Sequence, residues 1–312
     1  MGGVSRIIQT PAPASSRTGA GGSDAGKAAI AAGVTVVLWA SSFVAIRDIG
    51  HSLAPAPMAL LRLAVAAAAL TAIMAASRGR ALRFPASRRS IVLVMAYGVV
   101  WLGAYTVALN TAEHHVDAGT AAMLVNVAPL LVAFGAGLLL GEGFPVPLLL
   151  GSLVAFGGVV VIATGSSGDR DTIGVVLCLL AAVLYAFGVL VQKVILRSVD
   201  ALVATWLGCI VATVVLLPWL PQLIEQLRHA PAGAIVATIY LGVFPTAIGF
   251  STWAYALRRT PAGRLTASTY AVPAVSVLLS WLLLAEVPGV HGFVGGAICL
   301  AGVAISRRRS RR

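Results

Sequence analysis

Long apolar segments separated by short polar connections run through almost the whole chain. Apolar runs of about 20 residues, the length an α-helix needs to cross a bilayer, recur ten times. The predicted spans cover residues 28–46, 57–76, 91–109, 118–140, 146–164, 173–195, 201–220, 234–255, 265–284 and 289–305. This pattern predicts an all-α integral membrane protein with ten transmembrane helices in one bundle. Residues 1–27, rich in Gly, Ser, Pro and Ala, are expected to form a disordered tail, and residues 307–312 a basic one.

The first apolar run has a rival interpretation as a cleaved signal peptide. Its polar lead is long, however, and the run continues to Ile46. Both features favour an uncleaved first helix.

One stretch of the chain occurs twice. The sequence Leu-Leu-Leu-Gly-Glu ending at Glu142 returns as Leu-Leu-Leu-Ala-Glu ending at Glu286, and the same offset of 144 residues carries Pro129 onto Pro273. The chain is therefore predicted to consist of two related halves, residues 28–164 and 173–306, with five helices each. Because five is odd, the second half would enter the membrane from the opposite face. Such inverted repeats are the architecture of many secondary transporters.

Composition agrees with a membrane protein and excludes other classes. The 312 residues are 59% hydrophobic and 10% charged, whereas a soluble domain has about 25% charged residues. The net charge of +12 does not indicate nucleic-acid binding, because the basic residues gather in connections between spans. No glycine-rich phosphate loop is present, so no nucleotide or other cofactor is expected.

The distribution of basic residues predicts orientation. Eighteen Lys and Arg side chains fall in the tails and in the connections on one side, against only Arg47, Arg170 and Arg228 on the other. Basic residues concentrate on the cytoplasmic side of membrane proteins, so both termini are predicted to be cytoplasmic. Composition indicates a multi-pass protein of the bacterial inner membrane.

These features together resemble the EamA-type transporters of the drug/metabolite transporter superfamily. The matching pieces are residues 38–43 (Leu-Trp-Ala-Ser-Ser-Phe), the Leu-Leu-Arg ending at Arg62, and the duplicated helix pair that contains Glu142 and Glu286. The resemblance covers residues 28–306. It implies export or exchange of small metabolites, often amino acids, across the cell membrane, but it does not identify the solute.

Arg62 is the one charged residue well inside a predicted span. A guanidinium at that depth costs several kcal/mol unless it meets water, a carboxylate or backbone carbonyls. One interpretation makes it a cavity residue that attracts the carboxylate of an amino acid or organic acid. The alternative is structural: the side chain reaches outward to water, or pairs with Glu113 or Asp117.

Aromatic side chains form the second candidate group for solute binding. Tyr97, Trp101 and Tyr105 recur every four residues on one helix face, and Trp39 and Tyr185 occupy comparable places in the first helices of the two halves. Such rings could pack against the apolar part of a solute, although ordinary helix packing explains any single ring equally well. Near the end of another span, Trp253 and Tyr255 are predicted to lie at the membrane interface.

Prolines inside spans are expected to bend their helices. Each removes a helical hydrogen bond and leaves a carbonyl free, which makes Pro129, Pro245 and Pro273 candidate hinges. Polar residues near two of them add candidate solute contacts: Asn126, Ser268, Thr269 and Tyr270. Interhelical hydrogen bonding is the structural alternative.

Acidic residues fall only at span ends. For Glu142 and Glu286, a capping or hinge role repeated by symmetry is favoured over catalysis. Because no Asp or Glu lies inside a span, tight proton coupling is not expected unless a boundary group such as Glu142 or Asp117 titrates. We therefore expect facilitated movement or exchange down the solute gradient. Small residues on the fifth and tenth spans suit close helix contact, and a homodimer through them is an open alternative.

Two other classes of membrane protein are alternatives to a transporter. A membrane enzyme could use the serines of residues 165–168 or a metal at His114, His115, Glu113 and Asp117, but no histidine lies within a span and the metal spacing is not helical. A channel or sensor would need a polar filter or an output domain, and the sequence has neither. The sequence therefore favours a non-enzymatic carrier of a small-molecule solute with no metal.

Overall fold

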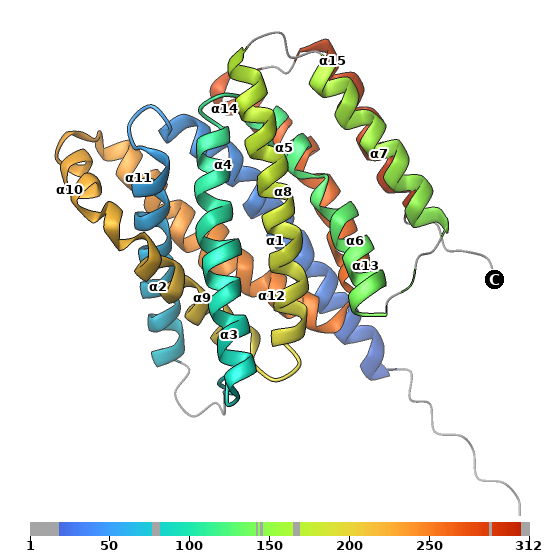
Figure 1. Ribbon diagram of the computed structural model, residues 1–312, viewed down its shortest axis with the longest axis horizontal. Helices are drawn as coiled ribbons and strands as arrows, with labels where there is room; N and C mark the ends of the chain where they lie inside the picture. Colours follow the sequence, from blue (N-terminus) through green and yellow to red (C-terminus); the bar gives the residue numbers. More distant parts are fainter. Residues whose placement is uncertain are drawn as a thin grey trace, which may run out of the picture.

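The computed structural model describes residues 19–76, 82–141, 143, 146–164, 169–286 and 289–306, and every regular element in these ranges is helical. The helices form one bundle, with α7 and α15 side by side at one edge (Figure 1). Glu142 and residues 165–168, and both expected tails in large part, lie outside the described residues.

The helices of the first half follow the predicted spans, with additional breaks. In chain order they are α1 (Gly19–Ile49), α2 (Pro55–Ala76), α3 (Arg88–Tyr97), the π-helix η1 (Gly98–Tyr105), α4 (Thr106–Ala112), α5 (Ala118–Val125), α6 (Ala128–Leu139) and α7 (Val146–Thr164). The first helix begins at Gly19, nine residues before the expected position, since no proline stands between Gly19 and Lys27 to prevent helix formation.

The second half contains more pieces. They are α8 (Asp169–Ile195), α9 (Ala201–Leu216), the 3₁₀ turn η2 (Leu217–Trp219), α10 (Leu220–His229), α11 (Ala232–Leu241), the π-helix η3 (Gly242–Ile248), α12 (Gly249–Arg259), α13 (Ala262–Thr266), the 3₁₀ turn η4 (Ala267–Tyr270), α14 (Ala271–Leu284) and α15 (Val290–Ser306). The short amphipathic α10 was not expected. Two prolines, Pro218 and Pro221, separate it from α9.

Eight helical runs in the described residues are long and apolar enough to cross a membrane. They are Asp24–Ile49, Pro55–Ala76, Arg88–Ala112, Ala118–Leu139, Thr172–Ile195, Ala201–His229, Ala232–Arg259 and Ala262–Leu284. The fifth and tenth predicted spans coincide with α7 and α15, where shorter apolar stretches run over Leu149–Gly158 and Phe293–Gly302. The protein is therefore an all-helical membrane protein with eight candidate spans in its described part.

The duplication seen in the sequence is also present in the helix boundaries. The helices α3, α5 and α7 begin at Arg88, Ala118 and Val146, and their counterparts α11, α13 and α15 each begin 144 residues later. The same offset relates the first residues of the two π-helices, Gly98 and Gly242. The repeat therefore includes the local irregularities of the helices as well as their order.

Each π-helix begins at a glycine because a neighbouring backbone lies against it. A Cβ on Gly98 would stand 2.8 Å from the carbonyl oxygen of Gly208 in α9, and a Cβ on Gly242 would stand 2.7 Å from that of Arg62 in α2. These distances are too short for any side chain. The π-helices are therefore held in place by equivalent close contacts, each of which joins one half to the other. Such π segments are frequent at functional sites.

Prolines interrupt corresponding helices of the two halves. Pro129 is the second residue of α6, after a break at Asn126 and Val127 that separates α5 from α6. Pro273 is the third residue of α14, directly after the 3₁₀ turn η4, and Pro245 lies inside η3. The distortion precedes Pro129 and Pro273 and includes Pro245, because the ring removes an N–H and clashes with the preceding turn.

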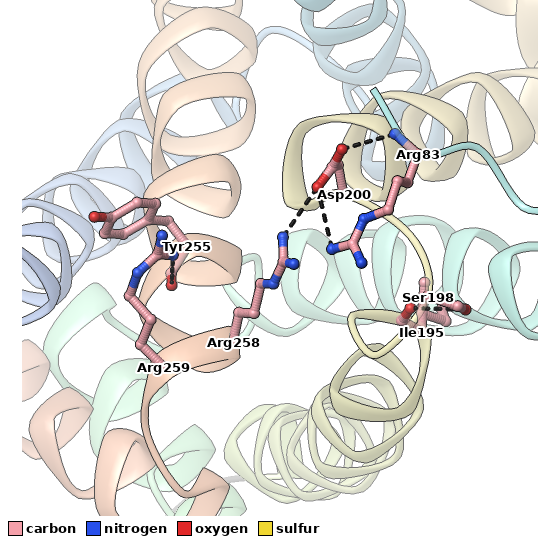
Figure 2. Close-up of polar contacts among 7 residues, drawn as sticks. All are labelled: Arg83, Ile195, Ser198, Asp200, Tyr255, Arg258 and Arg259. Atoms are coloured by element: carbon pink, nitrogen blue, oxygen red, sulfur yellow. Dashed lines mark hydrogen bonds and ion pairs between the residues drawn. The ribbon is translucent and has the colours of Figure 1, made fainter. Parts of the chain in front are cut away.

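One end of the bundle, called here the basic end, is held by Asp200 in the α8–α9 connection. Its carboxylate accepts a hydrogen bond from the backbone N–H of Arg83 at 2.7 Å and pairs with the side chains of Arg258 at 2.9 Å and Arg83 at 3.5 Å (Figure 2). Nearby, the guanidinium of Arg259 lies 3.6 Å from the ring centre of Tyr255. These contacts join α9, α12 and the segment that precedes α3.

The other end, called the opposite end, is held by Arg47 at the end of α1. Its Nε donates to Glu286 Oε1 at 3.1 Å, and its Nη1 donates to the backbone carbonyl of Glu113 at 2.9 Å. Lys193, the last basic residue of α8, makes the matching contact at the basic end, donating to the carbonyls of Leu257 and Thr260. In each half, therefore, a basic residue near the end of the first helix donates hydrogen bonds to backbone carbonyls at one end of the bundle.

Small residues bring α7 and α15 together within the chain. A Cβ on Gly302 would overlap the carbonyl oxygen of Gly151 and lie 2.6 Å from the backbone nitrogen of Ala155. The small residues expected to mediate close helix contact thus do so between the last helices of the two halves.

Candidate functional site

A cavity lies among the helices of both halves and encloses about 490 Å³ of space, open solvent included. Its walls come from α1, α2, η1, α4, α5, α6, α8, α12, η4 and α14. The lining residues are Trp39, Ser42, Phe43, Arg62, Trp101, Tyr105, Leu109, Val125, Asn126, Ala128, Pro129, Tyr185, Phe250, Thr269 and Val272. The cavity is mostly apolar, with few polar groups, as is typical of small-molecule sites.

The aromatic wall is built around Trp39. Its ring centre lies 6.4 Å from that of Trp101, 5.9 Å from Tyr185 and 5.2 Å from Phe250. These separations and the tilted or edge-on ring planes are the arrangement that aromatic pairs prefer. Residues predicted from the two halves, Trp39 and Tyr185 in particular, are therefore brought to one place.

Several polar atoms of the cavity wall are buried without a hydrogen-bond partner among the described residues. They are Nε1 of Trp39, Nε1 of Trp101, Oδ1 of Asn126 and the hydroxyl oxygen of Tyr185. Buried polar atoms in native proteins are nearly always paired. Two unpaired N–H donors, an amide oxygen and a hydroxyl at one cavity indicate a place where a polar solute can be bound.

Gly188 determines where Trp101 sits. A Cβ on this α8 glycine would overlap the Cβ and Cγ atoms of Trp101, whose side chain is fully buried. The Trp101 side chain therefore packs directly against α8 at Gly188, and only glycine leaves room for it.

Arg62 contributes the positive charge of the site. The residue is only 4% exposed, and in the described part of the chain its guanidinium makes one hydrogen bond, from Nε to Thr246 Oγ1 at 2.7 Å. No ion pair joins it to Glu113 or Asp117 within the described residues, and it does not reach the surface. The two structural alternatives for Arg62 are therefore not what the structure shows, and the side chain lines the cavity.

Asn126 enters the cavity wall because the helix is broken at this residue. It is the C-cap of α5, and its Nδ2 donates to the Ala122 carbonyl at 2.7 Å, so the amide nitrogen is engaged while Oδ1 has no partner among the described residues. Pro129 lines the cavity one turn later. The break and the proline thus both belong to the cavity wall.

Three predicted contact residues are not among the residues that line the cavity. Tyr97 lies behind Trp101, with ring centres 5.6 Å apart, and its hydroxyl accepts a hydrogen bond from Gln192 at 3.0 Å. Ser268 donates to the carbonyl of Leu265 at 2.7 Å, and Tyr270 is buried beside Ala267. Tyr97 was predicted from helical spacing and Ser268 and Tyr270 from their position before Pro273, and neither kind of argument specifies which side chains face the cavity.

The position of Trp253 differs from the prediction. The sequence predicts it at the membrane interface, but its side chain is fully buried and its ring centre lies 5.0 Å from that of Trp39. The prediction rested on the position of Trp253 near a helix end, but the side of α12 that carries Trp253 faces α1. Tyr255, the other residue of that pair, is half-buried under Arg259.

Sequence reasoning missed Thr246 and Phe250, whereas Thr269, one of the polar residues before Pro273, lines the cavity as predicted. A signal existed for the two missed residues: Pro245 corresponds to Trp101 at the offset of 144, so the repeat relates their segment to the cavity wall. Neither residue type is distinctive in an apolar span, however, and their roles emerge only from packing across the two halves.

Glu113 is the buried acid of the opposite end. It caps the C-terminus of α4 and is 2% exposed, and burial raises the pKa of its carboxyl group well above the ordinary value. Burial also lowers the pKa of the neighbouring His114. Among the described residues, no three His, Cys, Asp or Glu side chains are grouped as a metal site would require.

Comparison with known proteins identifies the family. The model of the EamA-like transporter family matches the chain twice, over residues 26–164 and 172–308. These two matches cover the two related halves. A protein of known crystal structure superimposes with a TM-score of 0.67 over 90% of this chain and 96% of its own, and at 19% sequence identity the likeness concerns the fold alone.

Curated relatives are similar over nearly the full length. A protein of Streptantibioticus cattleyicolor named "Probable terminal-alkyne amino-acid exporter" is 38% identical over 284 residues, which is 91% of this chain and 94% of that protein. The uncharacterized transporter YdfC of Bacillus subtilis is 29% identical, covering 86% and 87% of the two chains. The twofold family match and these relatives establish that the chain belongs to the EamA-like transporter family, whose members are membrane transporters and not enzymes.

Proposed function

We propose that this transporter carries small amino acids with an apolar side chain, as an exporter or exchanger that works by alternating access. The observation that carries the proposal is the position of Arg62, a buried guanidinium with one hydrogen bond, in the same cavity as Trp39, Trp101 and Tyr185. A carboxylate pairs well with a guanidinium, and an apolar side chain packs well against aromatic rings.

The polarity of the cavity supports this class of solute. Its walls are mostly aromatic and apolar, with a few polar groups among them, as is typical of small-molecule sites. Oδ1 of Asn126 and the hydroxyl of Tyr185, which have no hydrogen-bond partner among the described residues, supply acceptors for an ammonium group. The relative named as an exporter of a terminal-alkyne amino acid agrees in chemistry, since that solute combines a carboxylate, an amine and a short apolar chain.

The duplicated architecture supplies the mechanism. Ten spans in two inverted halves would offer two nearly equivalent packings, one open to each side of the membrane. The interrupted helices α5–α6 and α13–α14 and the π-helices η1 and η3 occupy corresponding places in the halves, and η1, α5, α6, η4 and α14 contribute residues to the cavity wall. Pro129, Pro245 and Pro273 are the hinges in this proposal, since each stands at an interruption.

The proposed orientation places the basic end in the cytoplasm of a bacterial cell, with both termini on that side. Arg83, Arg258 and Arg259 lie at this end, in agreement with the excess of basic residues on cytoplasmic faces. A homodimer stays a prediction, and Glu142 and Glu286 keep their proposed capping roles.

Proteoliposomes with purified protein test the proposal. Vesicles preloaded with unlabelled leucine, phenylalanine or propargylglycine would be given the same amino acid in labelled form, and the exchange of label would be measured. We expect exchange by the wild type and a loss of at least tenfold in Arg62→Ala.

The matched control is Arg228→Ala, which removes an exposed arginine of α10 whose side chain is 68% exposed. It should exchange like the wild type. Normal exchange by a folded Arg62→Ala variant would reject Arg62 as the solute contact, and no exchange of any of the three amino acids by the wild type would reject this solute class.

A further inference from the structure

Glu113 is a carboxylate that the transport proposal leaves without a role. It is 2% exposed, and both carboxylate oxygens are buried without a hydrogen-bond partner in the described part of the chain. It lies directly after α4, which packs against α2 and α8. A buried carboxylate without partners is stable only when it carries a proton.

The charged and titratable groups around Glu113 come from several elements. Those that act on it electrostatically are Arg47 of α1, Arg62 of α2, Tyr105 of η1, Asp117 before α5, Cys178 of α8 and Glu286 after α14. Burial is the largest influence and raises the pKa of Glu113, as do the acids Asp117 and Glu286, whereas the two arginines lower it. The protonation state of Glu113 therefore depends on how strongly the positive charges of the two arginines act on its carboxyl group.

The neighbouring ionic groups are already engaged elsewhere. Arg47 uses Nε for Glu286 and Nη1 for the backbone carbonyl of Glu113, so it does not bond to the carboxylate of Glu113. Asp117 accepts hydrogen bonds from the backbone N–H and the hydroxyl of Thr120. Among the described residues, Glu113 is the one of these three acids whose carboxylate makes no such contact, and Arg62 is a cation that forms no ion pair there.

Arg62 connects Glu113 to the cavity. Each of the two acts electrostatically on the other, and Arg62 lines the cavity while Glu113 lies beyond it toward the opposite end. A solute carboxylate at Arg62 would cancel the positive charge that favours ionisation of Glu113. Solute binding would then favour a proton on Glu113, and by reciprocity a proton on Glu113 would favour solute binding.

We propose that Glu113 is a proton-binding site linked to the solute cavity, so that a carboxylate-bearing solute binds at Arg62 together with a proton on Glu113. This inference rests on the proposed function. When Glu113 is ionised before binding, one proton from water forms the O–H bond of the carboxyl group for each solute bound. The sequence left proton coupling open only through a boundary acid such as Glu142 or Asp117. In this proposal the acid is another boundary residue, Glu113, which packing buries.

Binding measured against pH tests the linkage. Propargylglycine would be titrated into purified wild-type protein in detergent between pH 5.5 and 8.5, with binding followed by calorimetry. Above the pKa of Glu113, affinity should fall by up to about tenfold per pH unit. In a weakly buffered solution, the same titration should show proton uptake with a pH indicator.

Two variants and a control make the result specific. Glu113→Gln, neutral at every pH, should bind as tightly as the wild type at its most acidic pH, without pH dependence, and without proton uptake. Glu113→Asp keeps a titratable group and should retain both the pH dependence of binding and the proton uptake. The control Glu225→Gln changes an acid of α10 whose side chain is 61% exposed, and it should behave like the wild type.

The outcomes separate this inference from the transport proposal. Wild-type binding that does not vary with pH, or pH dependence and proton uptake that persist in Glu113→Gln, would overturn the linkage while leaving the amino-acid site intact. Persistent dependence would then belong to other groups at that end, such as His114. Absence of binding and of exchange in the wild type would instead overturn the proposed function, and the linkage with it.

Discussion

Arg62 in the first half and Thr246 in the second half are joined by a hydrogen bond of 2.7 Å from Nε to Oγ1. The same Thr246 hydroxyl donates to the carbonyl of Leu241, five residues earlier, at 2.8 Å. A partner five residues back is the spacing of a π-helix. The direction of the guanidinium is therefore tied to the irregular segment η3 of the other half.

This bond predicts that Thr246 positions Arg62 for solute binding. Thr246→Val removes the acceptor and should raise the KM for exchange about tenfold, with a smaller change in maximal rate, because a net hydrogen bond to a charged group contributes about 1.5–3 kcal/mol. Thr246→Ser should restore the KM. Exchange in proteoliposomes at varied solute concentration measures both values.

The matched control is Thr238→Val in α11, a buried threonine that donates to the Ala234 carbonyl at 2.8 Å and does not contact Arg62. Equal KM effects of Thr238→Val and Thr246→Val would contradict a positioning role.

Gly188 should be intolerant of a methyl group. In Gly188→Ala the new Cβ meets the Cβ and Cγ atoms of Trp101, so the indole must move and the aromatic wall of the cavity changes shape. We expect exchange to fall by tenfold or more, with a quenching or spectral shift of tryptophan fluorescence. Gly157→Ala, where no atom lies within 4 Å of the new Cβ, should match the wild type. Unaltered exchange in Gly188→Ala would show that the position of Trp101 is not critical.

Glu113 is expected to make the folded protein less stable as the pH rises. Its pKa in the folded protein is raised well above the ordinary 4.5, so above pH 4.5 the unfolded chain releases a proton that the folded protein keeps. Stability contributed by this group is thus greatest below pH 4.5 and declines as the pH rises toward the folded pKa. Glu113→Gln should melt at a higher temperature than the wild type at pH 7, and the difference should shrink as the pH approaches 4.5. Thermal melts in detergent measure it, and a lower melting temperature for the variant at pH 7 would contradict the buried, protonated state.

Arg47 should stabilise the opposite end through two contacts, the ion pair with Glu286 and the hydrogen bond to the Glu113 carbonyl. Arg47→Gln removes both the pair with Glu286 and the bond to the Glu113 carbonyl, whereas Glu286→Gln leaves the second bond in place. We expect faster amide hydrogen exchange over residues 112–117 in Arg47→Gln than in Glu286→Gln. Equal exchange in the two variants would assign the effect to the ion pair instead.

Several site residues could be predicted from the sequence because their chemistry is conspicuous in an apolar chain. Arg62 is a charge within a span, and Trp39 and Tyr185 are aromatic residues at matching places of a repeat; all three line the cavity. Thr246 and Phe250 could not be singled out in this way, since threonine and phenylalanine are ordinary residues in membrane helices. Tyr97 had the same spacing as Trp101 but packs behind it.

The sequence by itself determined the helical membrane class, the duplication and the family, because these depend on the length, hydropathy and order of local segments. Only the tertiary structure decided which side of each helix faces the cavity, as the burial of Trp253 against Trp39 shows. The same holds for Glu113, which in the sequence is a polar residue at a span end. Its burial results from packing by helices distant in the chain, and such non-local contacts set the dielectric environment that decides whether a carboxyl group keeps its proton.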